Sequence, residues 1–261
     1  MIWKTTICAV ILGSALTTTP GLQASESATL KVDVEVALSS LIALGDGHLE
    51  KMAASLAVLA TSSETRSTEW SNIKAPLADL AALNVPALLW FALPDGSYWD
   101  LEEGKAEGNL SERAYFPKVL AGEVVIGDLV VSKATGKNVA IVAVPVQVDG
   151  KVVAVLGSSI YLDRLSALLQ SQMSLDENTI FYAFDAQPLL AVVWDEGLIF
   201  QDPTALSPAV RRAFQKMMRD SDGTVTYPFR GQERTVRYQK SEVTDWWYAF
   251  GKVKAETPSG K

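Results

Sequence analysis

The sequence NVAIVAVPVQVDGKVVAVLGSSIYLDRL, residues 138–165, carries the clearest structural signal in the chain. Two apolar runs of strand length flank Asp149-Gly150. An Asp-Gly pair between two such runs is the strongest short signal for a β-hairpin with a two-residue turn. Residues 162–172 then place leucines three and four positions apart, a spacing typical of a helix. The segment therefore predicts an antiparallel hairpin that leads into a helix.

The residues before this hairpin predict three more strands and one short helix. Apolar runs separated by Gly, Pro and Asp clusters are typical of strands joined by turns. A polar stretch that contains glycine predicts a loop, and Gly122 is suited to end a helix. The predicted elements are strands at 87–93 and 97–101 around the turn Pro94-Asp95-Gly96, a loop at 102–109, a helix at 111–122 and a strand at 124–131.

The same order of elements recurs after residue 178. Ser207 and Pro208 are suited to the N-cap and the first turn of a second inserted helix. The predicted strands are 179–184, 189–194, 224–229, 233–239 and 246–253. The chain therefore predicts an α+β fold with two modules at 85–161 (the first module) and 178–254 (the second module). Each should hold a mainly antiparallel five-stranded sheet with flanking helices, and a linking helix should occupy 162–177.

A long helical pattern precedes the first module, within residues 25–84. From 29 to about 62, apolar residues recur every three or four positions, although Gly45 and Gly47 could kink the helix. A helix of about 30 residues is roughly 45 Å long, so we expect part of it to pack against a partner chain or a second module. A second helix is predicted at 70–83, with its regular part starting at Pro76.

The first 24 residues have the pattern of a secretory signal peptide. A short apolar run follows Lys4, and Ala24 is a small residue suited to a cleavage site. The alternative is an uncleaved membrane anchor. We expect export to the periplasm or secretion, with 255–261 as a tail.

Composition excludes several classes of function. The formal net charge is −7, so a general attraction to nucleic acid is not expected. One Cys and one His exclude a Cys/His zinc site, and no known nucleophile elbow or phosphate-loop motif occurs. The single His48 lies in the helical stripe, where a core or interface role is commoner than that of a base. We therefore predict no catalytic residues, no metal and no cofactor.

Five segments between 87 and 168 resemble the double Cache family, the tandem PAS-like sensor modules found outside bacterial membranes. An Arg-x-Tyr-Phe stretch at Arg113 is followed by a strand, a Thr-Gly turn, the hairpin and the helix start in the family's order. The segments are Asn109-Leu110-Ser111-Glu112-Arg113-Ala114-Tyr115-Phe116, Val125-Ile126-Gly127-Asp128, Ala134-Thr135-Gly136-Lys137, Val142-Ala143-Val144-Pro145-Val146 and Asp149-Gly150-Lys151-Val152-Val153 with Leu156-Gly157 through Leu162-Asp163-Arg164-Leu165.

The resemblance implies an extracytoplasmic sensor whose membrane-distal module, here the first, binds a small metabolite. Most family members continue into a second membrane helix and a kinase, cyclase or chemoreceptor. Because this sequence ends at Lys261 soon after the last predicted strand, we expect an exported protein that reports to a separate membrane receptor or kinase. We also expect a homodimer through residues 29–62, on the apolar positions Val34, Leu38 and Leu41.

Arg113 is the first candidate for ligand binding, because its planar guanidinium can hold a carboxylate through two hydrogen bonds. The alternative is an Arg that ties its loop to an acidic neighbour such as Glu112. Tyr115 could offer a hydroxyl or serve as a core aromatic residue. Trp90, Tyr98 and Trp99 fall on the first hairpin, the floor of the pocket in the family. Strand alternation puts Tyr98 and Trp99 on opposite faces, so at most one of them should face a ligand.

Amino-acid-binding members of the family place an Asp at the end of the last strand, where this sequence has Ser159. They also place a Tyr-x-Asp stretch before the Thr-Gly turn, where this sequence has Val130-Val131-Ser132. We therefore expect a carboxylate ligand without an α-amine, with Ser158 or Ser159 as hydrogen-bond donor. Two alternatives remain open: an interaction protein with vestigial pockets, and a Cache protein that binds an amine or amino acid.

Overall fold

A computed structural model describes residues 33–176 and 178–253. The predicted signal peptide, its cleavage site and the tail lie outside these residues. No helix within them combines the length and the hydropathy needed to cross a membrane. The first helices are α1 (Val34–Ala60), α2 (Ser63–Arg66) and α3 (Trp70–Ala82). The side chain of Asp33 accepts a hydrogen bond from the Glu35 N–H and so caps the start of α1.

The first module is an antiparallel sheet with the strand order β3-β2-β1-β6-β5-β4. The hairpin predicted at Asp149-Gly150 joins β5 to β6, and both residues have positive φ as the turn requires. The helix α4 is inserted between β3 and β4. The bounds are β1 Ala87–Ala92, β2 Ser97–Asp100, β3 Gly104–Asn109, α4 Phe116–Leu120, β4 Val125–Val131, β5 Asn138–Val148 and β6 Lys151–Tyr161.

Two details of the first module differ from the predictions. The polar stretch predicted as a loop at 102–109 contains a sixth strand, β3, because it pairs with the exposed edge of β2 although its own side chains are mostly exposed. The short helix predicted at 111–122 is confined to α4, because residues 111–115 form turns. The sheet therefore has six strands instead of five.

The second module follows α5 (Leu162–Gln172), which begins where the linking helix was predicted and ends before the predicted bound of 177. Its five-stranded antiparallel sheet has the order β8-β7-β11-β10-β9. Ser207 caps α6 as predicted, by accepting a hydrogen bond from the Val210 N–H. The bounds are β7 Thr179–Phe184, β8 Leu190–Val193, the 3-10 turns Glu196–Leu198 and Pro203–Ala205, α6 Pro208–Asp220, β9 Asp222–Phe229, β10 Gln232–Lys240 and β11 Trp247–Val253. The predicted α+β fold with two sheet modules is thus confirmed.

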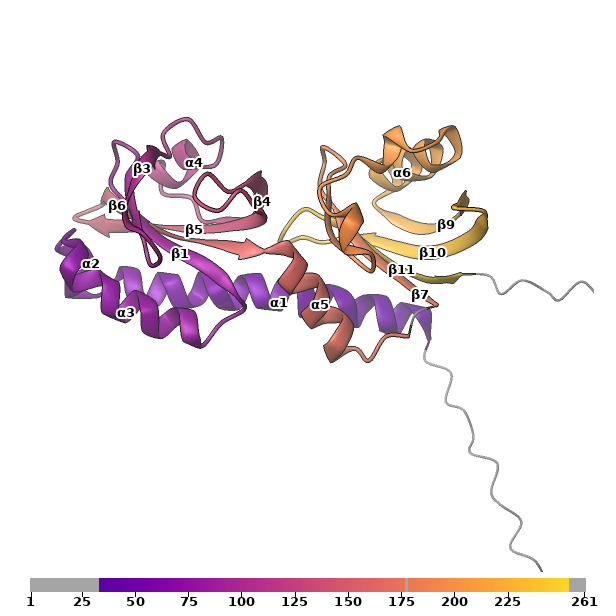
Figure 1. Cartoon of the computed structure of the whole chain (residues 1–261), viewed down its shortest axis with the longest axis horizontal. Helices are drawn as coiled ribbons and strands as arrows, with labels where there is room; N and C mark the ends of the chain where they lie inside the picture. The colour runs from indigo at the N-terminus through magenta and orange to yellow at the C-terminus, as the bar shows by residue number, and fades with distance from the viewer. Residues whose placement is uncertain (1–32, 177, 254–261) are drawn as a thin grey trace, which may run out of the picture. The chain divides into compact units, whose positions relative to one another are not determined.

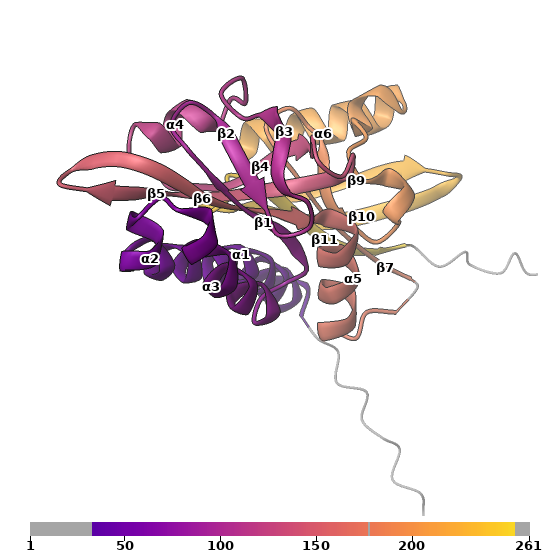
Figure 2. The ribbon, with the colours of Figure 1, turned by 60° about the vertical axis from the view of Figure 1, so that its left-hand side comes forward.

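Helix α1 packs against both sheets, on the side opposite to α4 and α6 (Figures 1 and 2). Contact with both sheets explains the length of α1. Of the two expected roles, packing against a partner chain or against a second module, the structure shows the second. Leu38 and Leu41, which suggested a dimer, are buried in the core of their own chain. Gly45 and Gly47 do not interrupt the helix. The predicted dimer therefore has no support from Leu38 or Leu41 and stays a prediction.

Helix α3 runs from Trp70 through Pro76 without a break, so the prediction that its regular part starts at Pro76 was wrong. A proline inside a helix leaves the carbonyl four residues earlier without its usual N–H donor. That carbonyl belongs to Asn72, which is exposed, so water can take the place of the missing donor.

The two modules and α1 meet around Asp46. Its buried carboxylate accepts hydrogen bonds from the hydroxyls of Ser241 (2.7 Å), Thr244 (3.2 Å) and Tyr248 (2.9 Å), which lie in or beside the β10–β11 loop. In the same loop, the indole Nε1 of Trp246 donates to the carbonyl of Gly127 in β4, at 3.0 Å. One short loop of the second module thus holds both α1 and the edge strand of the first module.

Candidate functional site

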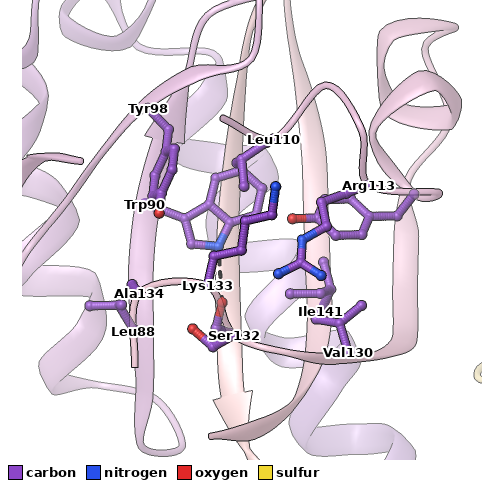
Figure 3. A pocket seen from close by; sticks show the side chains of 12 residues that line it. Leu88, Trp90, Tyr98, Leu110, Arg113, Val130, Ser132, Lys133, Ala134 and Ile141 are labelled. Carbon is purple, nitrogen blue, oxygen red and sulfur yellow. Dashed lines mark hydrogen bonds between the residues drawn. The ribbon is translucent and has the colours of Figure 1, made fainter. Parts of the chain in front are cut away.

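A pocket lies on the face of the first sheet that α1 does not cover (Figure 3). Its floor comes from β1, β5 and β6, and its walls come from β2, from the turns that precede α4 and from the turn after β4. It is lined by Leu88, Trp90, Tyr98, Leu110, Arg113, Tyr115, Val130, Ser132, Lys133, Ala134, Ile141 and Ser159. The structure therefore brings together five of the seven predicted site residues: Trp90, Tyr98, Arg113, Tyr115 and Ser159.

Trp90 forms the centre of the pocket floor. Its indole ring covers the backbone of Gly157 on the neighbouring strand, in the space that a Cβ atom at residue 157 would need. The indole Nε1 donates a hydrogen bond to the hydroxyl of Ser159 at 3.2 Å. That hydroxyl keeps its own proton for another acceptor, so it can serve as a donor to a ligand.

Arg113 reaches the pocket from the turns that precede α4. Its Nη2 donates to the carbonyl of Val131 at 2.8 Å. Within the described residues, no carboxylate lies within ion-pair distance of its guanidinium. Glu112, the acidic neighbour considered as its partner, instead lies 3.6 Å from Lys133. The guanidinium is held in place by a neutral carbonyl and keeps further N–H groups for a ligand.

Lys133 is a second cation at the pocket, and sequence reasoning did not single it out. Its ammonium donates to the carbonyl of Asn109 at 3.0 Å, which ties the turn after β4 to the end of β3. Figure 3 shows the side chains of both Lys133 and Arg113 extending over the pocket. The neighbouring Thr-Gly turn at Thr135-Gly136 was part of the family resemblance. That resemblance could have indicated that Ser132, Lys133 and Ala134 line the pocket.

Tyr115 and Tyr98 supply the aromatic walls. Tyr115 is buried and lies 6.2 Å from Trp90, measured between ring centroids. Burial raises the pKa of both phenols, although the charge of Arg113 partly opposes the increase. Both hydroxyls are therefore neutral at physiological pH and can donate a hydrogen bond.

Two predicted site residues lie outside the pocket. Trp99 points to the opposite face of the sheet, where its ring packs 6.1 Å from that of Phe91. Only Tyr98 of this pair lines the pocket, as strand alternation required. Ser158 lies on the same opposite face as Trp99, because it alternates with Ser159 along β6 and pairs with the core residue Leu89. Trp99 and Ser158 are therefore removed from the candidate site.

The lining side chains nearly fill the pocket. The space between them is about 20 Å³, which holds roughly one water molecule. A metabolite would require the turns at 109–115 and 132–137 to move away from the floor. These turns carry Arg113 and Lys133, so closure on a ligand would bring both cations onto it.

Comparison with known proteins identifies the fold. No protein-family model matches the sequence, and no curated protein matches it. Solved structures do match, at low sequence identity. The extracellular domain of the putative histidine kinase rpHK1S-Z16 is 18% identical with a TM-score of 0.70, over 87% of this chain and 96% of that domain.

Two chemoreceptor domains are similar to the same extent. The ligand-binding domain of PctB, an amino acid chemoreceptor of Pseudomonas aeruginosa PAO1 solved with L-Arg, is 14% identical with a TM-score of 0.66, over 87% of this chain and 98% of that one. The ligand-binding domain of Tlp3 from Campylobacter jejuni, solved with 4-methylisoleucine, is 15% identical with a TM-score of 0.64, over 87% and 91%. The chain thus has the double Cache fold of extracellular sensor domains, and these neighbours are sensory domains of receptors and of a kinase rather than catalytic domains.

Proposed function

We propose that this protein is an extracytoplasmic sensor that binds a small organic carboxylate in the first module. The observation that carries the proposal is the Arg113 guanidinium. It reaches into a pocket lined by aromatic rings, it is fixed by a neutral carbonyl, and it has no carboxylate partner within the described residues. A ligand carboxylate would supply that partner through the two parallel hydrogen bonds that guanidinium groups favour.

The charge of the lining favours a carboxylate without an amine. The pocket's lining residues include the two cations Arg113 and Lys133 and no Asp or Glu. A ligand ammonium group would therefore meet no acidic lining residue. A carboxylate would meet Arg113 and also Lys133, where it would compete with Glu112. Several neighbours with this fold were solved with amino acids. The amino-acid alternative for this chain would have to rely on the aromatic faces of Trp90 and Tyr115 to hold the amine.

The proposed ligand is small, with an apolar body. Trp90, Tyr98, Leu110 and Ile141 offer an apolar surface, and the hydroxyl of Ser159 offers one donor near the floor. The carboxylate end would lie toward Arg113 and Lys133. Binding would then bring the turns at 109–115 and 132–137 together. A ligand-dependent conformational change of this kind is what a partner protein could detect.

A thermal-shift screen of paired compounds tests this function. Each carboxylic acid is compared with its own primary amide and, where it exists, its α-amino acid, so that only the charged group differs. A ligand at 100 times its dissociation constant should stabilise the fold by about 2.7 kcal/mol. We expect acids to raise the melting temperature and their amides to leave it unchanged. Amino acids that act more strongly than the matched acids would favour the amine-binding alternative.

A second function is favoured by the small size of the pocket. If about 20 Å³ is all the space that this pocket ever offers, the protein is an interaction module with a vestigial site. In that case no acid, amide or amine in the screen would change the melting temperature. A binding partner would then use surfaces outside the pocket.

Export and signalling partners are part of the proposal. Cleavage after Ala24 would release the protein into the periplasm or the medium, and the intact mass of the exported product tests this. A product that retains residues 1–24 and sediments with membranes would support the anchor alternative. We propose a membrane receptor or kinase as the reader of the ligand state, on the basis of the fold's occurrence in such proteins.

We propose a homodimer through α1, but a smaller part of this helix is exposed for the contact than the sequence suggested. The exposed large apolar residues of α1 are Val34, Val36 and Val58, near its two ends. Sedimentation at high micromolar concentration tests it, and a monomer under those conditions would contradict it.

A further inference from the structure

We propose that the second module contains its own anion site, in which Arg234 holds the carboxylate of a small ligand with an apolar body. The site lies on the face of the second sheet that packs against α6, and it shares no residue with the pocket of the first module. The proposal does not depend on the function proposed above.

Arg234 is a buried cation, and two of its guanidinium nitrogens have no hydrogen-bond partner within the described residues. Its strand, β10, directs Arg234, Val236 and Tyr238 toward α6, and only 5% of the Arg234 surface is exposed. Its Nε and Nη1 atoms are fully buried and have no partner within the described residues. Burying a charge without a partner is costly, and burial accordingly lowers the pKa of this guanidinium. The arrangement is explained if an anion completes it.

Two aromatic rings hold the guanidinium in position. Its central carbon lies 4.7 Å from the ring centre of Trp194 and 4.6 Å from that of Phe229. Such contacts stabilise a cation through the ring faces and leave the N–H edge free for a planar acceptor. They do not neutralise the charge. A carboxylate fits the edge that remains.

The acidic group whose charge acts on Arg234, Asp195, is already engaged. The carboxylate of Asp195 pairs with Arg230 at 2.7 Å, and it also accepts from the Gly197 N–H. Arg230 is largely exposed, whereas Arg234 is buried. Within the described residues, no carboxylate lies within ion-pair distance of Arg234. The counter-charge would therefore have to come from outside the described part of the chain.

An apolar cavity adjoins the same two rings. Trp194 and Phe229 line it together with Tyr182 and Tyr227, whose hydroxyls are hydrogen-bonded to each other at 3.0 Å. The inner cavity holds about 20 Å³. A groove of about 530 Å³ adjoins it and shares the side chains of Leu198, Leu206 and Phe229. A ring or a branched chain could occupy this groove. Arg234 contacts the lining rings of Trp194 and Phe229 but does not itself line the cavity or the groove, so the carboxylate would reach the guanidinium after a movement of these side chains.

The chemistry of the lining therefore selects the ligand class. Aromatic and aliphatic side chains favour an aromatic or branched aliphatic body, and one buried guanidinium favours a single carboxylate. A second charge placed in the inner cavity would lie against apolar walls. We accordingly expect monocarboxylates with a ring of about six carbons to bind better than dicarboxylates.

The experiment uses 4-fluorobenzoate as the probe and its ¹⁹F NMR signal as the readout, with 4-fluorobenzamide as the neutral control. Four forms of the protein are compared: the unsubstituted chain, Arg234→Met, Arg212→Met and Arg113→Ala. Arg212→Met is the matched control, because Arg212 is an exposed cation of α6 that lines neither the cavity nor the groove. Arg113→Ala disables the pocket of the first module, so binding there is distinguished from binding at Arg234.

The expected result is saturable broadening of the 4-fluorobenzoate signal. Arg212→Met and Arg113→Ala should leave the affinity unchanged, and Arg234→Met should weaken it by about thirtyfold or more. The benzamide should not bind. Binding that Arg113→Ala or Arg212→Met abolishes and Arg234→Met retains would overturn the proposal. Absence of binding by the unsubstituted chain at millimolar probe would overturn it as well.

The melting temperatures of the variants, measured without the probe, show whether a loss of binding results from a loss of folding. Because methionine removes a buried unpaired charge, Arg234→Met should melt at the same or a higher temperature than the unsubstituted protein. A clearly lower melting temperature would mean that Arg234 serves the fold itself, and this too would overturn the proposal.

Discussion

The indole ring of Trp90 occupies the space in which a Cβ atom of residue 157 would lie. Glycine at this position of β6 lets a tryptophan from the neighbouring strand cover the backbone of the sheet. The floor of the pocket therefore depends on a residue that has no side chain. This relationship leads to the first of five predictions.

Gly157→Ala should displace Trp90, since the ring and the added methyl group overlap. We expect a loss of about 1–3 kcal/mol in the free energy of unfolding, the usual cost of an added methyl group in a packed core. Urea unfolding measures it. The control is Gly47→Ala in α1, where the added methyl group has open space. That change should stabilise the protein by roughly 0.5–1 kcal/mol, because glycine is unfavourable inside a helix. Equal effects of the two substitutions would contradict the structure around Trp90.

Much of the fold could be predicted because its signals are local. A few consecutive residues are enough to predict each of three features: the Asp149-Gly150 turn, the Ser207 cap and helix α5 with its leucines. β3 was missed because its side chains carry no alternation, and it pairs through its backbone with the edge of β2. The extent of α1 was predicted, but the sequence left open whether a partner or a second module covers it.

The site was predicted in part, for a related reason. Arg113, Tyr115, Trp90, Tyr98 and Ser159 carried either a motif or an aromatic ring at a strand position. Ser158 and Ser159 are chemically equal, and only the register of β6 with β1 assigns one to each face. Lys133 was missed because it lies in a turn, and its approach to the pocket depends on tertiary contact with Asn109. Arg234 looks like any strand arginine until burial is known.

The two neighbouring serines of β6 should respond differently to alanine. The Ser158 hydroxyl is buried with no partner in the described part of the chain. Removing an unsatisfied polar group should leave stability unchanged or raise it by up to about 1 kcal/mol, and ligand affinity should not change. Ser159→Ala takes the acceptor from the Trp90 Nε1, so it should lower stability by about 1–3 kcal/mol and weaken ligand binding. Thermal melts and titrations of both variants measure this, and the opposite order would place the pocket on the other face.

The Asp46 carboxylate should make stability depend on pH. Burial raises its pKa above the usual 3.8, although three hydroxyl donors oppose the increase. Above pH 3.8 and up to the raised value, the native state binds more protons than the unfolded state. This group's contribution to the free energy of unfolding therefore falls as pH rises through that window. Asp46→Asn removes the titration.

The test compares Asp46→Asn with the unsubstituted protein by urea unfolding at a series of pH values that begins below 3.8. The stability of the unsubstituted protein relative to the variant should decrease as pH rises and then become constant. A relative stability that increases with pH would mean that the hydrogen bonds from Ser241, Thr244 and Tyr248 outweigh burial.

The contact between Trp246 and Gly127 should couple the second module to β4. Trp246→Phe removes the indole donor and leaves the buried carbonyl of Gly127 without a partner, at a cost of about 1–3 kcal/mol. Amide hydrogen exchange should increase in β4 as well as in the β10–β11 loop. Trp70→Phe in α3 is the control, because Trp70 is only partly buried and lies away from this contact. Exchange that increases in the loop alone would show that the two modules are not coupled here.

The most direct test of the central claim is calorimetric titration of Arg113→Ala with the carboxylate that gives the largest thermal shift, beside Arg113→Lys and the exposed control Arg164→Ala. The account predicts a loss of about thirtyfold or more in affinity for Arg113→Ala, a smaller loss for Arg113→Lys because an ammonium lacks the paired donors, and none for Arg164→Ala. The melting temperature without ligand should stay nearly unchanged in all three. An unchanged affinity of Arg113→Ala, together with a lower melting temperature, would contradict the account.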